Sequence, residues 1–251
     1  MIYQISQLYR FHTDVMMARA PLEPFDPIVL KGLRDHVHGV LRQAIISGKL
    51  PSGSDLNERQ IAEELGISTT PVKEALRRLE GEGLIVTEPR RSSRVTFDAR
   101  QAEEMALARA ALESMIARMA AATITDADLA DLEQIFSQMA AATKVGDVPE
   151  LIQLNEQYHE AIHAISDCRY LQRVLIGQRV YDSATRAFLL GDVEERERAL
   201  AEHRAILDAL TERDSDAAER AMRDHVVRSG RQHVKTAFER RATTAKQEEI
   251  A

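Results

Sequence analysis

The feature that most constrains the fold is the stretch from Asp55 to Phe97, which is punctuated as two short helices around a tight turn. Asn57 followed by Gln60 is a capping pair that begins the first helix. Gly66 supplies the turn after that helix, and Ser68 caps the second one. The spacing therefore predicts a helix–turn–helix unit in this part of the chain.

The second helix of this unit has two chemically different faces. One face is apolar and carries Val72, Leu76 and Leu79. The other face carries small polar and basic side chains, which are Thr69, Thr70, Lys73 and Arg77. A second helix that opens in this way has the geometry that enters a DNA major groove. Two strands at 84–88 and 93–97 then predict a β-hairpin wing with basic residues at its tip.

These residues resemble the winged-helix domain of GntR-family bacterial transcription regulators. The matches are dense over residues 31–97 and include Leu65-Gly66, Thr70-Pro71-Val72-Lys73-Glu74-Ala75-Leu76 and Glu82-Gly83-Leu84. The resemblance implies a homodimer that binds a double-stranded DNA operator. It implies DNA contacts at Arg59, Ser68, Thr69, Thr70, Lys73 and, on the wing, Arg91.

Two of those positions depart from the family pattern. Thr69 and Lys73 stand where the family usually has arginine, and Ser92 replaces the wing glycine. Arginine reads guanine with two hydrogen bonds, whereas threonine and lysine do so less well. The family's usual operator sequence is therefore not expected for this chain.

The net charge of −7 is unevenly distributed along the 251 residues. Residues 31–97 hold 11 Lys/Arg and 9 Asp/Glu, whereas residues 98–251 hold 20 and 28. The excess of acidic residues thus lies outside the predicted DNA-binding module. DNA phosphates would repel this acidic part, which would help to orient the protein on DNA.

The single cysteine, Cys168, excludes an intrachain disulfide, and no apolar run is long enough to span a membrane. We expect a cytoplasmic protein.

The predicted fold class is mostly α, with the winged helix-turn-helix domain followed by an antiparallel all-α six-helix bundle. Residues 1–30 are predicted to form an N-terminal arm, since prolines recur every third residue at positions 21, 24 and 27. An alternative is that translation begins at Met16 or Met17. The winged domain spans 31–97, the bundle 100–240, and a frayed tail 241–251. The bundle helices are predicted at 100–122, 126–145, 148–165, 170–190, 194–213 and 216–240.

Three different bundle helices each place a histidine in an otherwise apolar seam. The histidines are His159, His203 and His225, and Asn155 precedes the first by one helical turn. One such histidine is more often a satisfied core residue, but three unpaired imidazoles in one core would be costly. A shared divalent metal would satisfy all three, and imidazole suits zinc, nickel, copper or iron.

The bundle half resembles the FCD ligand-binding domain of the FadR subfamily, in its six-helix VanR-like form. The resemblance implies a divalent metal, zinc first with nickel or manganese as further candidates, held by Asn155, His159, His203 and His225. It also implies an arginine and a glutamate four residues apart in the first bundle helix, here Arg109 and Glu113. Arg109 could clamp the carboxylate of a small organic acid effector. The alternative is an ordinary surface pair between Arg109 and Glu113.

A competing function rests on the segment His159-Glu160-Ala161-Ile162-His163, which matches the HExxH signature of zinc peptidases. In such an enzyme both histidines bind zinc and Glu160 activates water. The longer metzincin pattern fails, because Ser166 and Arg169 stand where glycine and histidine are required. A third possibility is a structural dimer module without an effector. The interpretation we favour is a metabolite-responsive transcription regulator, most simply a repressor, that is not an enzyme.

Overall fold

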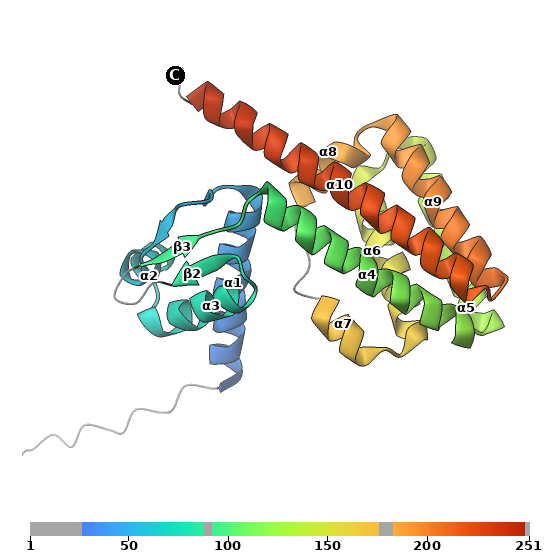
Figure 1. Cartoon of the computed structure of the whole chain (residues 1–251), viewed down its shortest axis with the longest axis horizontal. Helices are drawn as coiled ribbons and strands as arrows, with labels where there is room; N and C mark the ends of the chain where they lie inside the picture. Colours follow the sequence, from blue (N-terminus) through green and yellow to red (C-terminus); the bar gives the residue numbers. More distant parts are fainter. Residues whose placement is uncertain (1–26, 88–91, 176–182, 249–251) are drawn as a thin grey trace, which may run out of the picture.

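The structure is a computed structural model that describes residues 27–87, 92–175 and 183–248 of the chain. The N-terminal part contains α1 (Pro27–Ser47), α2 (Glu58–Leu65) and α3 (Thr69–Gly81). A small antiparallel sheet completes it, in the order β1 (Asp55–Leu56), β3 (Ser93–Val95), β2 (Ile85–Thr87). Figure 1 shows this unit at the left, beside a larger bundle of helices. The predicted winged helix-turn-helix domain is confirmed.

Local capping explains where the DNA-binding helices begin and end. The Asn57 side chain accepts hydrogen bonds from the backbone amides of Arg59 and Gln60, at 2.9 and 3.2 Å. Gly66 ends α2 in the left-handed region, with φ 66°, where a side chain would be strained. Ser68 occupies the cap position of α3, but its side chain makes no capping hydrogen bond there.

The first strand, β1, was not predicted. Its two residues pair with β3, Asp55 opposite Arg94 and Leu56 opposite Ser93. Two residues are too few to show an alternating pattern, and their partners lie far along the chain. The pairing depends on the tertiary fold, which brings the turn after α1 against the wing.

The first helix also begins earlier than predicted. Residues 27–30, assigned to the N-terminal arm, form the first turn of α1. Pro27 is at its start, where proline is favourable because its missing N–H would have no partner in the helix. The other two prolines of that pattern, at positions 21 and 24, lie outside the described residues.

The helical domain begins with α4 (Ala99–Thr123), α5 (Asp126–Val145) and α6 (Val148–Ser166). The Thr125 side chain and Asp128 form a reciprocal capping box at the start of α5. Gly146 ends that helix with φ 73°. These three helices agree with the predicted spans to within one residue.

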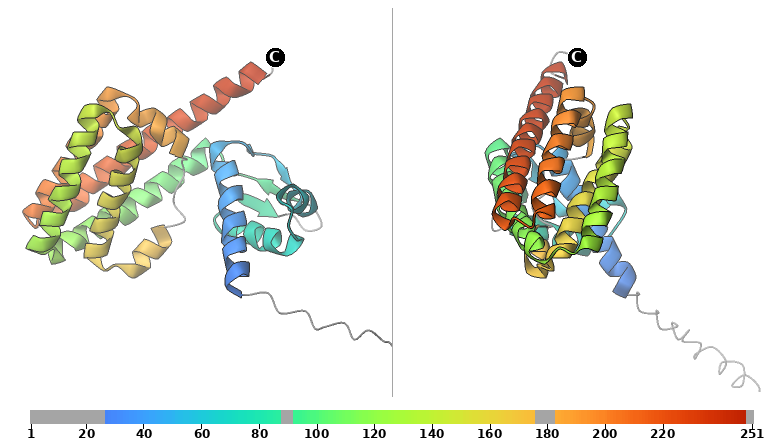
Figure 2. Two further views of the ribbon diagram at one scale, coloured as in Figure 1. Left: turned by 180° about the vertical axis from the view of Figure 1, so that it is seen from behind. Right: turned by 90° about the vertical axis from the view of Figure 1, so that its right-hand side faces the viewer.

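The second half of the domain differs from prediction in two places. The helix predicted at 170–190 is described as α7 (Arg169–Leu175) and α8 (Ser183–Leu190), with residues 176–182 outside the described part. After α9 (Val193–Thr211), α10 (Ser215–Glu248) continues well into the predicted tail. The sequence after Gly230 contains neither glycine nor proline, so nothing local ends the helix. Figure 2 shows its last turns extending beyond the rest of the fold.

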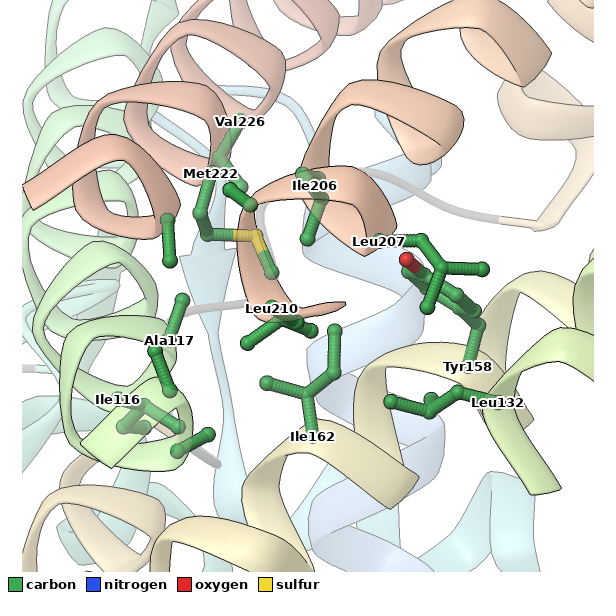
Figure 3. Packing of buried hydrophobic residues seen from close by; sticks show 14 of the residues in the cluster. Ile116, Ala117, Leu132, Tyr158, Ile162, Ile206, Leu207, Leu210, Met222 and Val226 are labelled. Atoms are coloured by element: carbon green, nitrogen blue, oxygen red, sulfur yellow. The ribbon is translucent and has the colours of Figure 1, made fainter. Parts of the chain in front are cut away.

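The core of the helical domain is built from aliphatic side chains on α4, α5, α6, α9 and α10, as Figure 3 shows. Tyr158 is completely buried among them, next to Leu132 and Leu207. Its hydroxyl donates a 3.0 Å hydrogen bond to the backbone carbonyl of His203, which ties α6 to α9. This bond also sets the position of α6 along α9, so that His159, the residue after Tyr158, lies opposite His203.

The two domains share a packed joint rather than a loose linker. Phe97 is 2% exposed, and its ring lies 6.0 Å from that of Phe238 on α10. Ala102 on α4 and Val234 on α10 belong to the same apolar core as the winged domain. These two helices run side by side across the molecule (Figures 1 and 2). The base of the winged domain therefore packs directly on α4 and α10.

No helix in the described ranges is both long and apolar enough to cross a membrane.

Candidate functional site

The three seam histidines converge at the centre of the helical domain. His159 comes from α6, His203 from α9 and His225 from α10, and they are 6%, 1% and 5% exposed. Each offers one ring nitrogen, and these nitrogens lie within 4.8 Å of one another. The ring centroids are 4.4–5.6 Å apart. The predicted convergence of three helices on one point is thus present in the structure.

The outer nitrogen of each imidazole is held by an oxygen. The Nδ1 atoms lie 2.6–2.8 Å from Glu113 Oε2 for His159, the Ala199 carbonyl for His203, and Glu202 Oε2 for His225. Such partners keep the proton on Nδ1 and leave the Nε2 lone pair available. This is the arrangement in which histidine binds a metal through Nε2.

Burial lowers the pKa of His159 and His203, which favours their neutral form. It lowers the pKa of His159 to about 4, despite the opposing effect of Glu113. The pKa of His203 is also well below its usual range, because of burial and the neighbouring histidines. Its Nε2 is buried and has no hydrogen-bond partner in the described part of the chain. An unpartnered buried nitrogen beside two other imidazoles fits a divalent cation such as zinc, since three protein ligands leave a position for a further ligand.

Arg109 and Glu113 form a buried pair, so the alternative of an ordinary surface pair is wrong. Glu113 is 0% exposed, and its Oε1 accepts from Arg109 Nε at 2.5 Å. Burial by itself would raise the pKa of Glu113, but Arg109 and His159 outweigh it and hold the pKa well below 4.5. The carboxylate is therefore ionised, and it links the arginine to the histidine cluster.

A small, partly open cavity adjoins this centre, with a volume of about 60 Å³. His159, His225, Asn155 and Arg109 line one part of it. Its remaining polar lining was not predicted and comprises Arg186, Glu195, Arg228, Ser229, Gln232 and His233. Those residues lie on α8, α9 and α10, and no local motif marks them, because only the packing of these helices brings them together. The cavity thus combines potential metal ligands with guanidinium groups.

The peptidase signature is not assembled as a catalytic site. Glu160, the residue that would activate water, is exposed on the outer side of α6. His163 lies outside the histidine triad, with its Nε2 3.7 Å from Glu113. His159 groups with His203 and His225 from two other helices. A second possible ligand group joins His159 and His163 to Glu113 of α4, not to the motif's own Glu160.

The residues predicted to contact DNA lie on the solvent side of the helix–turn–helix. Arg59, Ser68, Thr70 and Lys73 are exposed and Thr69 is half-buried, whereas the apolar face of α3 packs inward. Lys73 Nζ is 3.6 Å from Glu58 across the turn, in an exposed pair that water weakens. The wing residue Arg91 lies outside the described residues.

Comparison with known proteins matches both halves of the chain. Residues 33–95 match the model of bacterial regulatory proteins of the gntR family, and residues 104–228 match the FCD domain. The chain is 28% identical over 212 residues to the HTH-type transcriptional repressor RspR of Escherichia coli K12, covering 84% of this chain and 91% of that protein. It is 29% identical over 212 residues to the galactonate operon transcriptional repressor of the same organism, covering 74% and 90%.

A solved structure supports the same assignment. Escherichia coli McbR/YncC aligns with a TM-score of 0.58 and 25% identity, covering 83% of this chain and 98% of that one. Together with the two matched domain models, this similarity identifies a family of transcription regulators and not of enzymes. The chain belongs to the GntR family, in its FadR-like subfamily with a C-terminal FCD domain, and is a transcription regulator.

Proposed function

We propose that this regulator binds a double-stranded operator as a homodimer, and that a small carboxylate metabolite bound at a metal in the helical domain sets its operator affinity. The observation that carries the proposal is that Arg109 and two of the triad histidines line one cavity. The metal ligands would be Asn155, His159, His203 and His225, with zinc, nickel or manganese as the ion. Because the partner is chromosomal DNA, the regulator would act in the cytoplasm, and by analogy with its repressor relatives it would repress.

The chemistry of the cavity favours a small anion. A divalent metal held by neutral ligands keeps its positive charge, and a carboxylate oxygen is a suitable ligand for its open position. Arg109, anchored by Glu113, would hold the second oxygen or a neighbouring hydroxyl. Two relatives are named for the galactonate and gluconate operons, and both names refer to sugar acids.

The signal would pass along α4 and α10. Arg109 lies on α4, one turn after Ala106, which packs in the core of the winged domain. His233 lines the cavity from α10 and directly precedes Val234, which also belongs to that core. Binding that shifts either helix would move the base of the winged domain. Regulation additionally requires that the effector bind the DNA-free and DNA-bound forms with different affinity.

The DNA would be read by the exposed side of the helix–turn–helix. Arg59, Ser68, Thr69, Thr70 and Lys73 would meet bases and phosphates in the major groove, and Arg91 on the wing would reach the backbone or the minor groove. A homodimer presents this surface twice, so the operator would be a palindrome or nearly so.

The test combines operator binding with metal analysis. DNA from upstream of the regulator's own gene is titrated with and without a panel of sugar acids and dicarboxylates, and metal per chain is measured. His203→Ala should lower bound metal and abolish the effector response while leaving operator binding in place. The control is His36→Ala, an exposed histidine of α1. Metal content equal to the parent would remove His203 from the site, and no response to any acid would favour the structural dimer module.

A further inference from the structure

One face of α10 forms a continuous polar wall of the cavity. His225, Arg228, Ser229, Gln232 and His233 line it, at the spacing of successive helical turns. From His225 to His233 this wall extends over about 12 Å, at a rise of about 1.5 Å per residue. Of these five residues, His225 alone belongs to the histidine triad. A ligand that starts at the triad and fills the cavity would therefore meet side chains outside the proposed set of metal ligands.

Arg228, at the middle of this wall, is bound by two carboxylates. Its Nη1 donates to Glu195 Oε2 at 2.7 Å, and its Nη2 donates to Glu202 Oε2 at 2.9 Å. Glu202 is also 2.8 Å from His225 Nδ1, so it is directed towards the triad. Glu195 lines the cavity itself, and Glu202 is not among the lining residues. One guanidinium between two carboxylates leaves this part of the wall with one net negative charge.

Glu195 has an oxygen that can accept a hydrogen bond from a ligand. Its Oε2 receives the bond from Arg228, whereas its Oε1 is 3.7 Å from Arg198. The Arg198 side chain is 55% exposed, so water weakens this second pair. The backbone amide of Glu195 donates to the Asp192 side chain at 3.0 Å, which fixes the residue in the first turn of α9.

The triad end of the cavity has a different charge pattern. Arg109 lines the cavity there, but its partner Glu113 is completely buried behind it and is not a lining residue. A carboxylate bound near the triad would thus meet a guanidinium from α4. At Arg228 the carboxylate partner Glu195 faces the same space as the arginine. The two arginines therefore favour different groups on a ligand.

A hydroxyl group suits the Glu195 part of the wall better than a second carboxylate does. A hydroxyl both donates and accepts hydrogen bonds, so it can donate to Glu195 and accept from Arg228 or Gln232. An ionised carboxylate only accepts, and here it would lie beside a carboxylate of the same charge. Like charges placed together in a binding site reduce affinity by more than about tenfold.

We propose that Glu195 selects the effector: it admits a monocarboxylate that carries several hydroxyl groups, such as an aldonic acid, and it rejects the corresponding dicarboxylate. This selection rests on the proposed function for the metal-bound carboxylate and adds the class of acid. The carboxylate lies at the triad and Arg109, and the hydroxyl groups lie along α10. Glu195 is a specificity-determining residue and not a metal ligand.

Two matched pairs of acids test the selection. Gluconate differs from glucarate, and galactonate from galactarate, only in that a terminal CH₂OH group is replaced by a carboxylate. Calorimetry measures the binding of each acid to the zinc-loaded full-length protein. We expect an aldonate to bind more than about tenfold more tightly than its matched dicarboxylate. A dicarboxylate that binds as tightly as its aldonate, or more tightly, would overturn the proposed role of Glu195.

Glu195→Gln tests whether the charge of this side chain is the cause. The variant keeps the size of the side chain and a hydrogen-bonding oxygen, so it should reduce the preference for the aldonate by about tenfold or more. Glu195→Asp keeps the charge and should keep the preference. Glu194→Gln, at the exposed neighbouring position on α9, is the control and should bind as the parent does. An unchanged preference in Glu195→Gln, or its loss in Glu195→Asp, would contradict selection by charge.

The four acids also separate this selection from the proposed function. Dicarboxylate binding that requires zinc and is lost in His203→Ala would support the metal-bound effector and overturn the selection by Glu195 alone. Failure of the zinc-loaded parent to bind any of the four acids would count against both.

Discussion

In the winged domain the side chains predicted to contact DNA are exposed to solvent, whereas in the helical domain the side chains that could bind a metal are buried. Lys73 is 58% exposed and its nearest carboxylate is 3.6 Å away. Glu113 is 0% exposed and contacts both an arginine and a histidine within 2.6 Å. An exposed charge can be changed with little effect on folding, because water replaces its partner. A buried charge cannot, because its partners are left without compensation. Binding and stability are thus separable in the first domain and coupled in the second.

The largest effect is expected from Glu113→Gln, which removes the buried charge at the centre of the helical domain. Arg109 would lose its carboxylate and His159 would lose a charged acceptor. We expect a loss of about 3–5 kcal/mol in the free energy of unfolding. Metal affinity should fall by about 10–100-fold. Urea unfolding and metal analysis measure the two effects.

The matched control is Glu160→Gln, which makes the same chemical change at an exposed position on α6. It should alter neither stability nor metal content. Equal effects of Glu113→Gln and Glu160→Gln on stability and metal content would show that burial of the Glu113 carboxylate is not the cause.

Glu82 tests whether the winged domain contains a buried network of its own. Its carboxylate lies 2.7 Å from His38 Nε2 and 2.9 Å from Arg42 Nε. Burial raises the pKa of Glu82, but His38 and Arg42 outweigh this effect and leave it below 4.5. Glu82→Gln should therefore cost about 2 kcal/mol of stability at pH 7.

The sign of the pH dependence follows from that lowered pKa. The folded state prefers the ionised carboxylate, so its contribution is present above the unfolded-state pKa and is lost as the pH falls through the folded-state pKa. The stability gap between the parent and Glu82→Gln should shrink below about pH 4.5, the unshifted value. Glu74→Gln, in the exposed Arg34 pair, is the comparison and should show no such gap. A pH-independent gap would contradict the assignment.

Lys73→Ala should affect DNA binding and leave folding alone. Removing one phosphate or base contact should weaken operator binding by up to about tenfold and make the slope of log affinity against log salt shallower by about 1. Filter binding across a salt series measures both. Lys144→Ala removes the same charge from an exposed site on α5. Equal effects of the two variants would mean that Lys73 acts through overall charge and not at the DNA.

The smallest effect concerns the helix caps of the DNA-binding motif. Asn57→Ala removes an oxygen that accepts two backbone amides and should cost about 1 kcal/mol of stability. Ser68→Ala should cost less, because its hydroxyl makes no capping bond to α3. Thermal unfolding of the pair measures the difference. A larger loss for Ser68→Ala would show that the serine caps α3 in solution.

The helix–turn–helix could be predicted because its signals are local. Asn57, Gly66 and Pro71 act on amides and torsions within one turn of themselves, so their effect is visible in a short window. The same is true of Thr125, whose capping box begins α5 at Asp126, the first residue of the predicted span. Strand β1 could not be predicted in this way, since its partners Ser93 and Arg94 are remote in sequence.

In the helical domain, local sequence signals predict which residues are buried but not how the helices pack against one another. The 3.6-residue period placed His159, His203 and His225 on inward faces, and the structure confirms that all three are buried. Periodicity carries no information on the heights at which three separate helices meet. Nor could it show that Arg109 and Glu113 form a buried pair, because the same i, i+4 spacing is common on helix surfaces.

Short-range chemistry was thus sufficient for the fold class, the helix ends and the choice of candidate histidines. Packing between distant segments was required to bring those histidines together, to enclose Arg109 and Arg186 in one cavity, and to join the winged domain to α10 through Phe97 and Phe238. The physical reason is the distance along the chain over which each kind of interaction acts. Capping and periodicity act over a few residues, whereas a binding site depends on where helices far apart in the chain come into contact.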